Sequence, residues 1–127
     1  MLKTKSVYSP IDRKADGLRI LATRFRGRGM KSSRYHVWMA NLGPSERLLR
    51  GGHDWQEFGR RYRREIWESI SNDTRNSTIK NHGQKFTLRL LKFLAKRQVV
   101  TLMCHCDEDQ PHCHRHLLRR LLASNRI

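Results

Sequence analysis

The chain has 127 residues, and 27 Lys and Arg against 11 Asp and Glu give it a formal net charge of +16 at pH 7. This length fits one domain over residues 1–127 that folds without disulfides, and no run approaches the ~20 apolar residues of a membrane span. A field of this sign attracts polyanions, so nucleic acid or a phosphorylated ligand is the expected partner. A plain solvated basic surface would have the same composition.

The first quarter of the chain predicts two strands joined by a turn. Residues 2–7 alternate in the manner of a half-buried strand. Pro10, Asp16 and Gly17 then supply the chemistry of a turn. Residues 18–25 are denser in apolar side chains, which is typical of a strand covered on both faces.

The segment that follows is rich in arginine and glycine. Glycine breaks regular structure, and guanidinium groups beside exposed backbone N–H groups suit phosphate. We therefore predict a loop that binds phosphate or nucleic acid, although an exposed loop with incidental arginines would look the same. The candidate residues are Arg24, Arg26, Arg28 and Lys31.

Two helix starts are visible in the middle of the chain. Pro44 and Ser45 favour a helix start. The clearest helix covers residues 54–70, where Asp54 and Glu57 have the spacing of a capping box. Aromatic residues recur there every three or four positions, which indicates a core-facing side.

The second half of the chain alternates helix and strand. Residues 71–83 are polar and predict an exposed loop, and residues 84–98 predict an amphipathic helix. Residues 99–104 form a short apolar run that indicates a central parallel strand, and residues 113–122 predict a last helix. The order predicts an α/β fold of three layers, with a mainly parallel sheet and helices on both faces. Cations line one side of the amphipathic helix, which fits a phosphate backbone or a solvated face: Lys85, Arg89, Lys92 and Lys96.

The arginine-rich loop and the cysteine-histidine stretch over residues 104–116 both leave the ends of expected strands. Ligands of open α/β sheets bind beyond the carboxyl ends of the strands. The two segments are therefore expected to meet at one rim. All three cysteines lie within ten residues, which is typical of a reducing compartment. The chain also starts without an apolar leader, so we expect a cytoplasmic protein.

The cysteine-histidine stretch supports three interpretations. Cys113 precedes the last helix, where free N–H groups favour a thiolate, and His114 and Arg115 could transfer protons or bind an anion. Alternatively, Cys104 and Cys106 point to one face of a strand and could bind zinc together with Cys113 and a histidine. In the third interpretation the cysteines are simply small buried residues.

A phosphatase loop is excluded because it needs an arginine where His112 stands.

The last helix is expected to turn leucines inward and to leave Arg115, Arg119 and Arg120 facing out. The leading hypothesis needs no metal or cofactor. It assigns chemistry to Cys104, Cys113, His114 and Arg115.

Several segments resemble one family. "LMCHC" followed by "CHRHLL" is similar to the C-x-E…C-H-R-x-L-L signature of the domain-of-unknown-function family numbered 488. "VYSPIDRKADGLRILATRFRGRGMK", "NLGPSERLL" and "WQEFGRRYRREI" resemble its earlier segments in the same order. The resemblance implies a small Rossmann-like domain of unestablished activity. It places Cys104, Cys113, His114 and Arg115 at the family's candidate site, with Arg24 facing it.

One position departs from the family pattern. Cys106 stands where many members carry glutamate, which argues against a general base there. The expected function is therefore a nucleic-acid- or nucleotide-directed α/β domain with a Cys/His/Arg pocket at the carboxyl edge of the sheet. The alternative is a non-enzymatic module that zinc stabilises or that binds another protein.

Overall fold

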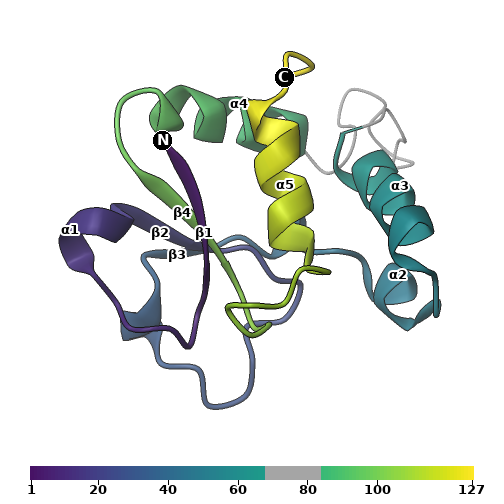
Figure 1. Cartoon of the computed structure of the whole chain (residues 1–127), viewed down its shortest axis with the longest axis horizontal. Coiled ribbons are helices and arrows are strands. Elements are labelled where there is room, and N and C mark those ends of the chain that lie inside the picture. Colours follow the sequence, from purple (N-terminus) through teal and green to yellow (C-terminus); the bar gives the residue numbers. More distant parts are fainter. Residues whose placement is uncertain (68–83) are drawn as a thin grey trace, which may run out of the picture.

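A computed structural model describes residues 1–67 and 84–127. Within them the chain forms a parallel four-stranded sheet with helices packed against it (Figure 1). The expected loop over residues 71–83 lies outside the described residues. The strands are β1 (Leu2–Ser6), β2 (Leu18–Leu21), β3 (Val37–Trp38) and β4 (Val100–Cys104), and their order across the sheet is β1-β4-β2-β3.

The last strand of the chain occupies the middle of the sheet. β4 pairs with β1 on one side and with β2 on the other, and Leu102 is in register with both Thr4 and Ile20. All five residues of β4 are buried, because a central parallel strand is covered on both faces. The short apolar run in the sequence is therefore confirmed as a central strand.

The helices begin where the sequence places capping residues. Ser45 accepts a hydrogen bond from the backbone of Leu48, and Asp54 accepts one from the backbone of Glu57. The helices are α1 (Arg13–Asp16), α2 (Glu46–Arg50), α3 (Trp55–Ile66), α4 (Gln84–Ala95) and α5 (His114–Ala123). Two 3-10 turns, η1 (Ser32–Arg34) and η2 (Ala40–Leu42), lie between β2 and α2.

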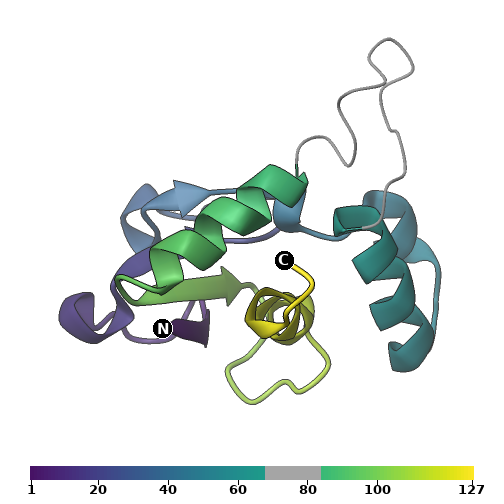
Figure 2. The same cartoon turned by 90° about the horizontal axis from the view of Figure 1, so that it is seen from above.

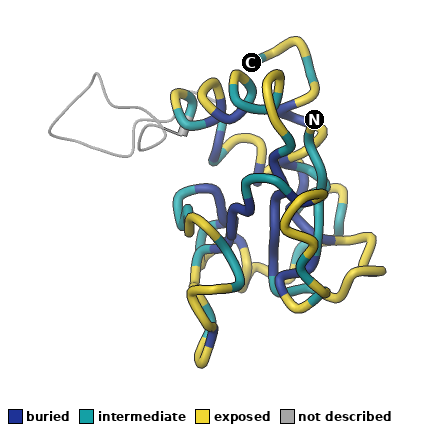
Figure 3. The backbone as a smooth tube through the Cα atoms, turned by 90° about the vertical axis from the view of Figure 1, so that its left-hand side faces the viewer, coloured by how far each residue is buried: buried dark blue, intermediate teal, exposed yellow. Residues whose placement is uncertain are grey.

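The two faces of the sheet are covered unequally. Side chains of α3, α4 and α5 pack with Ile20 and Leu102 in the main core, on the side where Figure 2 shows the long helices. On the opposite face Leu21 and Met103 pack with Met30 from the arginine-rich segment. Dark blue buried residues accordingly run through the centre of the sheet in Figure 3. The predicted α/β class with a parallel sheet is confirmed, and the second face is closed mainly by a loop.

The cations of α4 do not form one continuous free stripe. Lys92 donates from Nζ to the carbonyls of Ser124 and Ile127, at 2.6 and 3.0 Å, and so holds the C-terminus. The ammonium of Lys85 lies over the ring of Trp67, 4.9 Å from its centroid. Among the described helices, none is both long enough and apolar enough to cross a bilayer.

Candidate functional site

Three sulfur atoms converge where β4 ends and α5 begins. Cys104 is the last residue of β4, and Cys113 is the N-cap of α5. Their Sγ atoms lie 2.8 Å apart. The Sγ of Cys106, from the loop between them, completes a group whose members all lie within 4.8 Å of one another. Cys104 and Cys113 are buried, whereas Cys106 is half-buried.

Arg115 is directed inward and holds the loop after β4. Its side chain is completely buried, and its Nη1 donates to the Sγ of Cys104 at 2.8 Å and to the carbonyl of Cys106 at 3.3 Å. Nη2 donates at 3.0 Å to the carbonyls of Asp107 and Glu108. The expectation that Arg115 faces solvent is therefore wrong, because its guanidinium is needed to satisfy the sulfur and these carbonyls.

These contacts shift the pKa values of the two buried thiols in opposite directions. The hydrogen bond from Cys113, the charge of Arg115 and the backbone N–H of Cys106 lower the pKa of Cys104 to about 6, against the effect of burial. The same hydrogen bond, together with burial and the neighbouring negative charge, raises the pKa of Cys113. The pair therefore holds one proton on Cys113 and one negative charge on Cys104 near neutral pH.

His114 is neutral and fixed in one tautomer. Burial and the charge of Arg115 lower its pKa to about 4. Its Nε2 is hydrogen-bonded to the carbonyl of Ala22, and a carbonyl only accepts, so Nε2 carries the proton. Nδ1 is left as an acceptor and lies 4.0 Å from the Sγ of Cys113. The edge of the imidazole also meets the buried ring of Tyr62.

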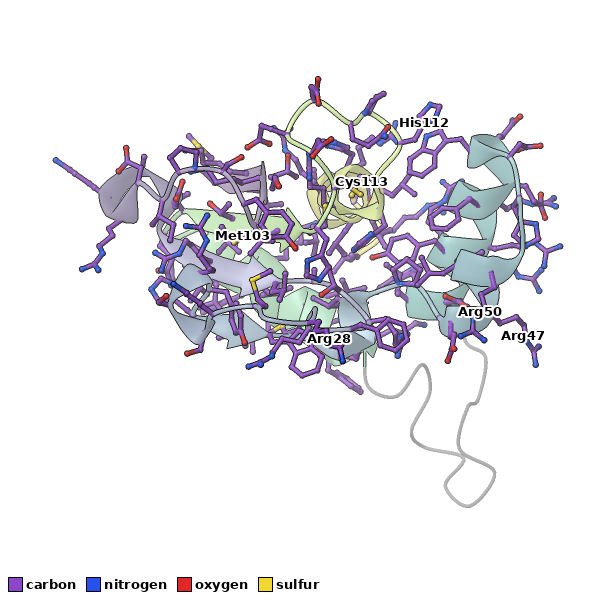
Figure 4. All side chains as sticks on the ribbon, turned by 90° about the horizontal axis from the view of Figure 1, so that it is seen from below. Arg28, Arg47, Arg50, Met103, His112 and Cys113 are labelled. Carbon is purple, nitrogen blue, oxygen red and sulfur yellow. The ribbon has the colours of Figure 1, made fainter. Side chains whose placement is uncertain are left out.

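A cleft of about 300 Å³ opens beside the sulfur group. The rings of Trp55 and His112 are stacked on its wall with centroids 5.0 Å apart, and Phe58 stacks on Trp55 at 5.4 Å. Figure 4 shows Cys113 at the start of α5 and His112 above it, toward α3. The cleft is lined by Leu49, His53, Trp55, Phe58, Cys106, His112, Cys113 and His114.

The arginine-rich loop and the cysteine-histidine stretch meet at the carboxyl edge of the sheet. His105, directly after β4, donates from Nε2 to the carbonyl of Phe25 at 3.1 Å. A Cβ on Gly27 would lie 2.7 Å from the His105 ring, so the loop approaches this closely only with glycine there. The bond between His114 and Ala22 joins α5 to the same loop.

The family whose model matches this chain is DUF488-N3a, described as the active DUF488-N3 subclade, and the match covers residues 2–126. The chain belongs to the DUF488 family. Neither the curated proteins nor the solved structures contain a match. The cysteines, histidine and arginine that the resemblance assigns to the DUF488 site lie together in this chain: Cys104, Cys113, His114 and Arg115.

The other arginines of this DUF488 protein lie apart from the sulfur group. Arg24 donates from Nε and Nη2 to the carbonyls of Pro44 and Gly43, at 3.1 and 2.8 Å, and so ties the loop to the start of α2. Arg28 and Lys31 line a separate hollow of about 210 Å³, and Figure 4 shows Arg28 on the far side of the sheet edge from Cys113. Arg26 is exposed.

Sequence patterns do not reveal the aromatic wall of the cleft. Trp55 belongs to the helical aromatic series and was expected in the core, yet it is half-buried and lines the cleft. His112 lies in a loop, where no periodicity indicates direction. A signal does exist for Trp55: it comes directly after the N-cap of α3, at the end of the helix that faces the start of α5.

Proposed function

We propose that this DUF488 protein is a nucleic-acid- or nucleotide-directed enzyme that uses its cysteine pair at the carboxyl edge of the sheet. One observation carries the proposal: a buried guanidinium donates to the sulfur of Cys104, while Cys113, whose sulfur is paired with that of Cys104, lines an open cleft. A cation beside a cysteine favours the thiolate, which is the reactive form.

The geometry supports nucleophilic chemistry by Cys113. Cys113 lines the cleft, and its thiol proton can pass to the Sγ of Cys104, which lies 2.8 Å away and acts as the base. As that proton moves, the Cys113 sulfur bonds to an electrophilic carbon of the ligand, and the displaced electron pair leaves with the ligand's leaving group. Arg115 keeps the pair anionic until the transfer occurs, and neutral His114 can accept a hydrogen bond at Nδ1.

The cleft and the charge of the chain support a nucleotide as the ligand. The cleft wall carries the aromatic rings of Trp55, Phe58 and His112, and nucleobases stack on aromatic rings. The net charge of +16 draws phosphate groups toward the protein. Arg26, Arg28 and Lys31 lie outside this cleft, and they are proposed to contact phosphates of a ligand that extends beyond it.

Alkylation by iodoacetamide tests the proposal. We expect the modification, mapped by mass spectrometry, to fall on Cys113, and we expect a mixture of nucleoside monophosphates to slow it. Cys104→Ser should reduce the rate at neutral pH, because Cys113 loses the thiolate that acts as base and takes its proton as it reacts. Cys106→Ser is the matched control and should retain fast alkylation. An unreactive Cys113, or alkylation that nucleotides leave unchanged, contradicts the proposal.

The three sulfur atoms also favour a second candidate function, a zinc-stabilised module. Cys104, Cys106 and Cys113 offer ligands within 4.8 Å of one another, and the Nδ1 of His114 lies 4.0 Å from the last of them. Structural zinc sites use such Cys₃His sets. Elemental analysis of the purified protein separates the candidates: stoichiometric zinc that is lost with Cys106→Ser, with unfolding, supports the module.

A further inference from the structure

Each strand of the sheet is followed or ended by a ring at its carboxyl end. Tyr8 comes two residues after β1, His105 comes directly after β4, Phe25 comes four residues after β2, and Trp38 is the last residue of β3. Because the strands lie in the order β1-β4-β2-β3, the rings come from four adjacent strands. We call Tyr8, His105, Phe25 and Trp38 the ring row.

Three of the rings are exposed and His105 is half-buried, yet several of their positions are fixed. The exposed fractions are 64% for Tyr8, 56% for Phe25 and 41% for Trp38. The centroids of Tyr8 and His105 lie 6.0 Å apart. The indole of Trp38 donates to the carbonyl of Thr23 at 2.8 Å, and His105 donates to the carbonyl of Phe25. A series of large rings held in water indicates a surface for a partner.

Cations lie directly beside this row. Tyr8 shares the hollow of about 210 Å³ with Arg28 and Lys31, both of which are exposed. Arg34 also lines this hollow. Its Nη2 donates hydrogen bonds to the carbonyls of Val7 and Ser9, at 2.7 and 2.6 Å. The surface therefore combines flat apolar groups with positive charge, which matches bases joined by phosphates.

We propose that the ring row is a stacking platform for single-stranded nucleic acid. The inference rests on the proposed function and names the substrate class of the same site. The rings of Tyr8 and His105 have centroids 6.0 Å apart, so neighbouring rings can each take one unstacked base. Duplex bases are already stacked and paired, and their faces are inaccessible. His105 lies between Cys104 and Cys106 in the chain, so the row adjoins the loop that carries the cysteines.

Fluorescence anisotropy with labelled oligothymidylate tests the platform, and a blunt duplex of the same length is the comparison. Phe25→Leu should weaken single-strand binding about fivefold or more, and Phe25→Trp should restore it. Phe93→Leu is the matched control, because Phe93 is 52% exposed but lies on α4. Arg28→Gln should reduce the salt dependence of binding, whereas Arg47→Gln on distant α2 should not (Figure 4).

The outcomes separate this inference from the proposed function. Preference for the single strand, with loss in Phe25→Leu and recovery in Phe25→Trp, supports the platform. Binding that prefers the duplex, or that ignores Phe25, overturns the platform alone and leaves nucleic-acid-directed chemistry standing. If neither oligonucleotide binds and nucleotides do not protect Cys113, the platform and the proposed function both fall.

Discussion

The guanidinium of Arg115 and the sulfur of Cys104 form a fully buried contact, with 2.8 Å between Nη1 and Sγ. A buried cation needs compensating charge, and carbonyls supply only partial charge. Glu108 has a carboxylate oxygen 3.6 Å from Nη2, but its side chain is 53% exposed. The Cys104 thiolate is therefore the buried anion that balances Arg115, and each group depends on the other.

We predict that Arg115→Met strongly destabilises the protein. The substitution leaves the sulfur of Cys104 without its cation and three loop carbonyls without their donor. Breaking a buried charged pair costs about 3–5 kcal/mol, which thermal and urea unfolding would measure. The double variant Arg115→Met/Cys104→Ala should recover part of the loss, because it removes both charges.

Arg119→Met is the control for this prediction. Arg119 lies on the same helix one turn later, but its side chain is exposed. Its replacement should change the free energy of unfolding by no more than about 0.5 kcal/mol. Equal losses in the two single variants would show that helix propensity, rather than the contact with Cys104, controls the effect.

The cysteine pair predicts that stability passes through a maximum with pH. The folded pKa of Cys104 is about 6 against an ordinary 9.0, so its stabilisation is complete above pH 9.0 and is lost as the pH falls toward 6. The folded pKa of Cys113 is raised, so its stabilisation is complete below pH 9.0 and is lost as the pH rises further.

Urea unfolding at a series of pH values measures this dependence. The free energy of unfolding, taken as the difference between the wild type and Cys104→Ala/Cys113→Ala, should be largest near pH 9.0. The double variant removes both titrating groups and serves as the baseline. A difference that stays constant with pH would contradict the shared proton.

The sequence predicts the parts of the fold that depend on local pattern. Apolar runs and caps identify β4 and the starts of α2 and α3. β3 has only two residues, both exposed, and exists because Val37 and Trp38 pair with β2. No local pattern marks such a strand. The expected strand over residues 18–25 likewise ends at Leu21, because the chain then turns to cover the second face.

The sequence predicts where the candidate site lies, but it predicts less well which way the side chains of the site point. Strand order places the two segments at one edge, and their contacts confirm this. The outward prediction for Arg115 is wrong because it follows charge alone, whereas the helical phase of Arg115 places it on the inner side of α5. Leu118 and Leu122 follow at three and seven positions, so Arg115 lies in their apolar stripe. Only tertiary contacts show that a buried sulfur compensates it there.

Asp16 gives a prediction for acid stability. Its carboxylate is 2% exposed and pairs with Lys5 at 2.8 Å. Burial acts to raise its pKa, but hydrogen bonds from Lys5 and from the backbone of Asp12 lower it below the ordinary 3.8. Its stabilisation is therefore present above pH 3.8 and is lost as the pH falls through the lowered folded value.

Thermal unfolding of Asp16→Asn across acidic pH tests this. The variant should be less stable than the wild type at neutral pH, and the gap should narrow as the pH falls below 3.8. Glu46→Gln removes an exposed pair with Arg50 and should have little effect at any pH. A gap for Asp16→Asn that persists in acid would assign the loss to packing rather than to charge.

Two glycines allow backbone strain and crowding to be separated. Gly17 and Gly29 both have positive φ, +58° and +73°, which side chains rarely adopt. A Cβ on Gly17 would lie 2.2 Å from the carbonyl oxygen of Val99, whereas nothing lies within 4 Å of one on Gly29. Gly29→Ala should therefore cost only about 1–2 kcal/mol of conformational strain. Gly17→Ala must also displace the backbone before β4, which accepts a hydrogen bond from Leu18. We expect the melting temperature of Gly17→Ala to be at least ~4 °C below that of Gly29→Ala. Equal melting temperatures would show that the backbone before β4 shifts at little cost.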